Sequence, residues 1–275
     1  MCRLKSAIIL KNRIFIPDYD NHNKMLKELG IKDDYLNASK TFVRAELSPK
    51  NNDVFSDIDT WELNVDQDIT PDWFDKNKHK QLMIKAVKEW AKNHIHIGVN
   101  NLKINTGMSH YIKDCQNTEI CDLATIEHIC GSTTIERICD SATVKRIYDP
   151  ATVKRIYDSA TVERICGSTT IERICGSATV KYIYDSATIK YIYDLATIEH
   201  ICGSTTIERI CDSATVKRIY DPATVEHIYG SATMISSPYT EWKNSNKVNI
   251  TDNATFKDCY TKTIYQSGDW KLIKV

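Results

Sequence analysis

The sequence predicts a mainly β protein: a β-solenoid with 18-residue coils, preceded by a small α+β domain and followed by a C-terminal β cap. Two observations carry this prediction. Thirteen similar nonapeptides run from Cys121 to about Met234, and residues 18 apart within them alternate in charge and in size. We divide the chain into residues 1–115 (α+β capping domain), 116–234 (solenoid) and 235–275 (cap).

The repeat unit has the sequence of a strand and a turn. It can be written (Cys/Tyr)-(Asp/Gly)-x-(Ala/Thr)-Thr-(Val/Ile)-(Glu/Lys)-(Arg/His/Tyr)-Ile, and residues 139–147 (CDSATVKRI) are one copy. Its β-branched residues favour a strand, and its Asp or Gly followed by a small residue favours a turn. A nonapeptide is too short to close one turn of a solenoid, so each coil needs two or more units.

The charged seventh position of the repeat indicates two units per coil. In a two-unit coil, residues 18 apart stack at about 4.8 Å. Nine of the ten stacked pairs then carry opposite charges, whereas spacings of 9 and 27 give about half. Opposite charges on neighbouring strands stabilise a sheet, and like charges destabilise it. The two ladders are Glu127, Lys145, Glu163, Lys181, Glu199, Lys217 and Glu136, Lys154, Glu172, Lys190, Glu208, Glu226.

The first position of the repeat supports the same spacing through side-chain size. Cys130, Tyr148, Cys166 and Tyr184 alternate small and large at intervals of 18. Duplication of a 36-residue block is an alternative source of the pattern, since residues 121–156 and 193–228 differ at only three positions. Duplication accounts for recurrence every 36 residues but not for the order within the block, so we favour the 18-residue coil.

The apolar positions of the repeat predict the solenoid interior. We assign it to the small fourth position, the Val or Ile sixth position and the Ile ninth position, as in Ala142, Val144 and Ile147. The sixth and ninth positions are three apart, which breaks the alternation of a regular strand, so we expect a bend or bulge near the eighth position. The array alone provides six-odd coils, about 30 Å of rod.

The composition argues against several functional classes. The net charge is zero, and neither half of the chain is strongly basic or acidic, so nucleic acid is not the expected partner. The apolar run near the start is broken by Lys11 and Asn12, which predicts neither a signal peptide nor a membrane span and indicates a cytoplasmic protein. Seven of the ten cysteines share the first repeat position with Tyr, so we expect space-filling reduced thiols that bind no metal. Only Cys121 and Cys139 stack directly on each other.

The flanking segments are predicted to form a small α+β domain (residues 1–115) and a degenerate coil (residues 235–275). In residues 1–115 the patterns predict strands or helices at 7–16 (a strand pair), 23–29 (a helix), 41–47 and 60–65 (strands) and 76–93 (a helix with Leu82, Ile84, Ala86, Val87 and Trp90 on its apolar side). Residues 252–256 resemble the repeat core, and residues 263–270 read as strand and turn. Both segments would cap the exposed ends of the solenoid, with Trp242 and Trp270 as apolar lids.

Several groups of side chains are candidate functional sites. Asp66, Asp68, Asp72 and Asp75 offer oxygen ligands for calcium, but they lack the spacing of an EF-hand loop, so we favour a solvated loop with Asp75 as helix N-cap. His94 and His96 lack a third metal ligand. The threonine column resembles an ice-binding face, but most of its threonines have a Glu or Lys two residues on, which argues against that activity.

The eighth position of the repeat provides the candidate interaction stripe. It is basic and aromatic, and it either binds a polyanion or forms a solvated face neutralised by the neighbouring Asp turns. Its arginines are Arg137, Arg146, Arg155, Arg164, Arg173, Arg209 and Arg218.

The array, the segment from Trp61 to Phe74, the Val87-Lys88-Glu89-Trp90 helix and the ending from Lys262 to Trp270 together resemble a group of uncharacterised bacterial and phage or mobile-element proteins. Members of that group carry YGNATV/YDSATV-type short tandem repeats behind a small N-terminal domain. The resemblance implies no activity. With no catalytic motif in view, we expect a non-enzymatic structural or protein-binding solenoid that uses no cofactor and has another protein as partner. A polyanion- or nucleic-acid-binding module is the alternative.

Overall fold

The computed structural model describes residues 5–107, 109–239, 241–243 and 248–266. The chain forms two compact units, Met1–Ile95 and His96–Val275, and each is described by itself.

The N-terminal unit is built on a four-stranded antiparallel sheet with the strand order β2-β1-β3-β4. Its strands are β1 (Lys5–Leu10), β2 (Arg13–Phe15), β3 (Phe42–Ser48) and β4 (Glu62–Val65). Its helices are α1 (His22–Glu28), α2 (Tyr35–Lys40), α3 (Lys76–His94) and the short 3-10 helix η1 (Ile58–Thr60). The strand pair around Lys11 and Asn12 and the two later strands are therefore confirmed.

The helices of this unit bury apolar residues against the sheet. Met25 and Leu26 of α1 pack with Ile8 and Phe42. Helix α3 contacts β2, β3, β4 and η1, and Asp75 caps its start by accepting a hydrogen bond from the Lys78 backbone N–H at 2.9 Å, as predicted.

The predicted apolar side of α3 is partly wrong. Ile84 and Val87 are buried as expected, but Leu82 is 45% exposed, and Met83 lies in the core instead. The buried set Met83, Val87 and Ala91 recurs every four residues, so the buried face is centred one residue further along the helix than predicted.

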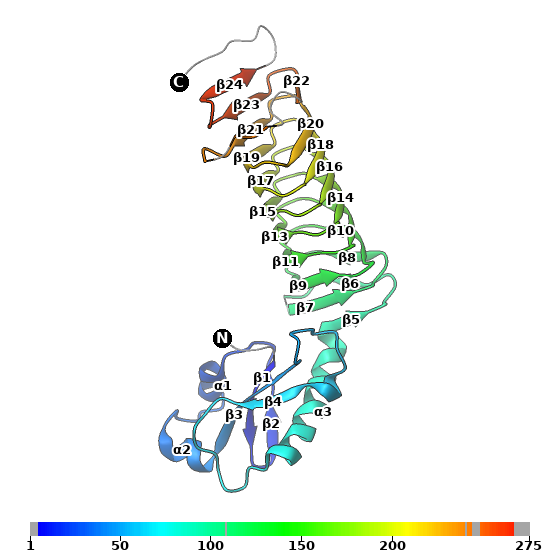
Figure 1. Ribbon diagram of the computed structural model, residues 1–275. Helices are drawn as coiled ribbons and strands as arrows, with labels where there is room; N and C mark the ends of the chain where they lie inside the picture. The colour runs from blue at the N-terminus through cyan, green and yellow to red at the C-terminus, as the bar shows by residue number, and fades with distance from the viewer. Residues whose placement is uncertain (1–4, 108, 240, 244–247, 267–275) are drawn as a thin grey trace. The chain divides into compact units, whose positions relative to one another are not determined.

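The second unit is a β-solenoid whose strands alternate between two sheets (Figure 1). The 11-stranded sheet contains β5 (Ile95–Ile97), β7 (Ser109–Lys113), β9 (Thr125–Cys130), β11 (Thr143–Ile147), β13 (Thr161–Ile165), β15 (Thr179–Ile183), β17 (Thr197–Ile201), β19 (Thr215–Ile219), β21 (Thr233–Ser236), β23 (Thr255–Asp258) and β24 (Thr263–Gln266). The 9-stranded sheet contains β6 (Lys103–Ile104), β8 (Thr118–Ile120), β10 (Thr134–Ile138), β12 (Thr152–Ile156), β14 (Thr170–Ile174), β16 (Thr188–Ile192), β18 (Thr206–Ile210), β20 (Thr224–Ile228) and β22 (Asn249–Ile250).

The strand register confirms the 18-residue coil. Thr143 pairs in parallel with Thr125 on one side and with Thr161 on the other, and the same spacing continues along both sheets of the array. Outside the array the coils change length: Tyr111 pairs with His128, and Thr233 pairs with Thr255. The solenoid has about nine coils instead of six, because strands before residue 116 and after residue 234 join the same ladders.

The interior consists of the predicted positions. Ala142, Val144 and Ile147 are each 0% exposed, and their equivalents form one continuous cluster along the unit. Within each strand the sixth and ninth positions point inward while the seventh and eighth point outward. Because every coil bends at the same place, neighbouring strands stay in register despite the broken alternation.

An Asp or Gly with a positive φ at the second position turns most corners. Asp140, Asp194 and Gly176 have φ angles of 56°, 56° and 63°, in the left-handed region that Gly and Asp tolerate better than most residues. The Asp carboxylates also link coils. Oδ2 of Asp194 accepts a hydrogen bond from the Gly176 backbone N–H at 3.0 Å, and Oδ2 of Asp185 accepts one from Gly167 at 3.1 Å.

The C-terminal coil reuses the repeat core with larger side chains. Ala254 and Phe256 are fully buried, and Phe256 packs edge-on against Trp242 with ring centroids 5.1 Å apart. The indole Nε1 of Trp242 donates a hydrogen bond to the Ala223 carbonyl at 2.7 Å. Trp242 is thus an apolar plug in the last coils, and Trp270 lies outside the described residues.

Candidate functional site

The seven arginines of the predicted stripe lie in two separate columns. Arg146, Arg164 and Arg218 are on the 11-stranded sheet, in β11, β13 and β19. The other four are on the 9-stranded sheet: Arg137, Arg155, Arg173 and Arg209. A single stripe is therefore wrong, because consecutive nonapeptides alternate between the two faces of the coil. The 18-residue period already required this separation.

The 9-stranded face carries the longest run of arginines. Arg137, Arg155 and Arg173 stand on the successive strands β10, β12 and β14. The Arg137 guanidinium contacts Oε2 of Glu119 at 2.9 Å, and this hydrogen bond, together with one from Lys103, holds the pKa of Glu119 below its usual value. Arg155 and Arg173 are exposed. Arg155 lies over the ring of Tyr157, and Arg173 lies opposite Tyr191 on the neighbouring strand, so each has a tyrosine rather than an acid as its neighbour.

The same face continues with a contact between Tyr191 and Arg209. Arg209 lies over the Tyr191 ring, 5.3 Å from its centroid, and its Nη1 is 3.4 Å from the Tyr191 hydroxyl. A guanidinium over an aromatic face is stabilised by the ring quadrupole without losing its charge. This column therefore contains planar cations and aromatic rings in contact on the surface of the 9-stranded sheet.

The 11-stranded face is more aromatic. Tyr182 and His200 stack with centroids 5.0 Å apart and an interplanar angle of 11°, and Tyr111 stacks on His128 in the same way at 5.6 Å. Burial is the main cause that lowers the pKa of His128, with a smaller contribution from Arg146. Burial therefore favours the neutral form of His128.

The seventh-position ladders beside these columns form the predicted ion pairs. Lys145 contacts Glu127 at 2.6 Å and Lys154 contacts Glu136 at 2.7 Å, in each case across one coil. Lys217 pairs with Glu199 at 3.4 Å. On the 11-stranded face the ladder holds three Glu and three Lys, which cancel, so the three arginines of that face leave an excess of positive charge.

Among residues 109–239, the corner aspartates form no ion pair with the eighth-position arginines. Their carboxylates accept hydrogen bonds from backbone N–H groups of the preceding coil, as at Asp185 and Asp194. Between residues 109 and 239, the eighth-position arginine that forms an ion pair is Arg137. The carboxylates keep their charge, and residues 121–234 hold 15 acidic against 12 Lys and Arg side chains, so the arginine columns belong to an array with a small negative net charge.

The cysteine columns are packing positions with one exception. Cys121 and Cys139 form a disulfide with a Cα–Cα distance of 4.8 Å, where reduced thiols were expected. These two cysteines stack on each other, whereas elsewhere a tyrosine separates the cysteines of a column. The thiol of Cys175, for example, hydrogen-bonds to Tyr193 and thereby raises the pKa of that phenol to about 12. Burial raises the pKa of Cys175 and Cys211, which makes both poor nucleophiles.

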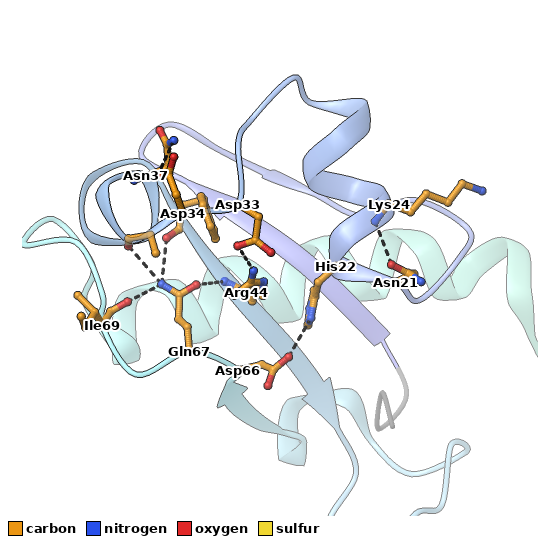
Figure 2. Close-up of polar contacts among 12 residues, drawn as sticks. Asn21, His22, Lys24, Asp33, Asp34, Asn37, Arg44, Asp66, Gln67 and Ile69 are labelled. Atoms are coloured by element: carbon orange, nitrogen blue, oxygen red, sulfur yellow. Dashed lines mark hydrogen bonds and ion pairs between the residues drawn. The ribbon is translucent and has the colours of Figure 1, made fainter.

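His94 and His96, the candidate pair of metal ligands, belong to different units. His94 ends α3, stacks on Trp90 at 4.4 Å and contacts Oδ1 of Asp18 at 3.2 Å. Nε2 of His96 lies 3.1 Å from Nδ1 of His110 in the solenoid. Sequence reasoning missed a different cluster in the N-terminal unit, where Asp66 meets His22 (Figure 2). No sequence signal pointed to it, since 44 residues separate the two.

Within the described parts of the chain, no helix combines the length and apolar character that crossing a lipid bilayer requires. Comparison with protein-family models, with curated proteins and with solved structures finds no match for this chain.

Proposed function

We propose that this chain is a non-enzymatic solenoid that acts as a rigid spacer and as a binding surface for another protein. It requires no cofactor for this role. We place it in the cytoplasm, or in the host cytoplasm if a phage or mobile element encodes it. The proposal rests on the solenoid's architecture and on the regularity of its two outer faces.

One observation supports this function above others: a filled interior combined with ordered side-chain columns on both faces. The interior positions of the repeat are at most 4% exposed, so the array has no ligand cavity along its axis where these side chains lie. Its outer columns repeat Arg, Tyr and His at one-coil spacing, and Arg and Tyr are enriched where proteins bind one another. Stacked repeats also give a stiff, extended surface.

A capture experiment with face-specific variants tests the proposal. The intact chain, Arg164→Ala/Tyr182→Ala on the 11-stranded face and Arg155→Ala/Arg173→Ala on the 9-stranded face would be compared as baits in host lysate. We expect one double variant to lose a protein that the intact chain and the other double variant retain. The proposal fails if both variants capture the same proteins in the same amounts as the intact chain.

The polyanion-binding alternative has one observation of its own. Arg137, Arg155 and Arg173 stand on successive strands at about 4.8 Å intervals and so form a row of cations that could contact several charged groups of one polyanion. Elution from a heparin column above physiological salt, lost in Arg155→Gln/Arg173→Gln but not in Arg146→Gln/Arg164→Gln, would support it. Elution of the intact chain below physiological salt would exclude it.

A further inference from the structure

Three metal-ligating side chains meet in the N-terminal unit. His22 is the first residue of α1, Glu46 lies in β3 and Asp66 directly follows β4. One ring nitrogen and one oxygen from each carboxylate all lie within 4.8 Å of one another. His22 and Glu46 are 6% and 8% exposed, whereas the Asp66 side chain is 66% exposed. The cluster thus has a buried floor and an open side.

The hydrogen bonds of His22 fix which of its nitrogens can bind a ligand. Nε2 lies 3.2 Å from the Ala45 carbonyl oxygen, which can only accept, so Nε2 carries the hydrogen. Nδ1 lies 3.2 Å from Oδ2 of Asp66. In the neutral ring, Nδ1 would present a lone pair to a carboxylate, so the contact is favourable when Nδ1 carries a proton, as in an imidazolium–carboxylate pair, or when a cation lies between the two atoms.

Proteins commonly hold metal-binding histidines in this way. A backbone carbonyl accepts from one ring nitrogen, which fixes the tautomer and aims the other nitrogen at the metal. Ala45 supplies that carbonyl here, from the residue beside Glu46 in β3. One strand therefore provides both a ligand and the group that orients a second ligand.

The third ligand is held by a well-bonded loop. The Asp66 backbone N–H donates to the Arg44 carbonyl at 2.9 Å. The neighbouring Gln67 accepts from the Arg44 N–H at 2.8 Å and donates to the Ile69 and Phe42 carbonyls at 2.6 Å and 3.2 Å. Figure 2 shows Gln67 at the centre of these contacts, with Asp66 turned toward His22. The loop backbone is thus preorganised, while the exposed Asp66 side chain can still adjust.

We propose that Nδ1 of His22 and the carboxylates of Glu46 and Asp66 bind a divalent transition-metal ion. Two ligands about 2.1 Å from a common ion and 3.2 Å apart subtend an angle of about 100°, between the octahedral and tetrahedral values. The three ligand atoms lie within 4.8 Å of one another, and binding of the ion would draw the farthest pair closer together. An imidazole with two carboxylates suits Mn²⁺, Fe²⁺ or Zn²⁺ better than Ca²⁺. The ion would tie the start of α1 to the loop after β4.

Mn²⁺ is the probe for this site, because it prefers carboxylates to thiolates and so avoids the cysteines of the solenoid. The full chain, stripped with EDTA, would be titrated while the signal of free Mn²⁺ is followed by electron paramagnetic resonance. We expect one Mn²⁺ bound per chain, and at least about tenfold weaker binding in Asp66→Asn. Asp68→Asn, in the same loop but outside the cluster, is the matched control and should bind like the intact chain.

Each result of this titration decides the proposal. Asp66 is mostly exposed, so Asp66→Asn should keep its melting temperature in EDTA and isolates the loss of a ligand. Glu46→Gln is the second variant, and Mn²⁺ should raise the melting temperature of the intact chain but not of this variant. No retention of Mn²⁺, equal binding in Asp66→Asn, or equal weakening in Asp68→Asn would each overturn the proposal.

Discussion

The two units of the chain reach a stable core by opposite routes. The N-terminal unit depends on contacts that each occur once, such as Lys5 with Asp20 and Gln67 with Phe42. The solenoid repeats one set of contacts every 18 residues, so that each coil buries the same positions against the next. Stability in the repeat is shared among equivalent sites, whereas the N-terminal unit concentrates it in particular pairs.

The largest expected effect tests the equivalence of the coils. Ile165 is 0% exposed and lies in the ladder between Ile147 and Ile183. Ile165→Ala should lower the free energy of unfolding of the solenoid by about 3–4 kcal/mol, through lost burial and the cavity left behind. Ile201→Ala, at the same position two coils later, should cost the same within error in denaturant unfolding. A difference of more than about 1 kcal/mol between the two would show that the coils are not equivalent.

A single pair in the N-terminal unit should matter nearly as much. The Lys5 side chain is 0% exposed, with Nζ 3.0 Å from Oδ1 of Asp20 and 4.9 Å from the centroid of the Trp90 ring. Asp20→Asn would leave a buried ammonium without its counter-charge and should cost about 3 kcal/mol in urea unfolding of this unit. Glu89→Gln, which breaks the exposed pair with Lys92, should cost less than about 0.5 kcal/mol. Equal costs for the two variants would contradict this assignment.

Substitution of glycines with a positive φ should have an intermediate effect on stability, and two such sites separate backbone strain from steric clash. Gly203 has a φ of 67°, and a Cβ there would lie 2.6 Å from the Asp185 backbone nitrogen. Gly203→Ala should therefore cost more than about 2 kcal/mol, from the unfavourable φ and the clash together. Gly98 has a φ of 65° with nothing within 4 Å of the added atom, so Gly98→Ala should show the strain alone, about 1 kcal/mol. Thermal unfolding of both variants measures the difference, and equal shifts would exclude a clash.

The contrast between the units also explains what the sequence could predict. In the solenoid, charge and size at repeated positions predict the coil length and the ion-pair ladders, and the repeated apolar positions predict the interior. The same period implies two arginine columns, because consecutive nonapeptides lie on opposite faces of the coil. The prediction of a single stripe did not take this into account. The Cys121–Cys139 pair was located by the same spacing, although its disulfide was not expected.

In the N-terminal unit each helix and strand occurs once, so no repeated pattern in the sequence could test the predicted elements. The strands of its sheet were found from their alternation. Helix α2 was missed because its six residues include the exposed Tyr35 and Leu36 and have no buried side. The cluster of His22, Glu46 and Asp66 was missed for a different reason. It draws on three elements that only the folded sheet brings together, and no short motif encodes such an encounter.

The smallest expected effect tests the ladder that first revealed the coil. Nζ of Lys145 lies 2.6 Å from Oε1 of Glu127, and the next coil places Glu163 beside it in the ladder. Lys145→Glu would stack three carboxylates on successive strands and should cost about 1 kcal/mol at low salt, less at high salt because the repulsion is screened. Lys145→Gln removes the attraction without adding repulsion, so its smaller loss should depend less on salt. If melting temperatures of Lys145→Glu fell equally at both salt concentrations, side-chain packing rather than charge would set the register of the coils.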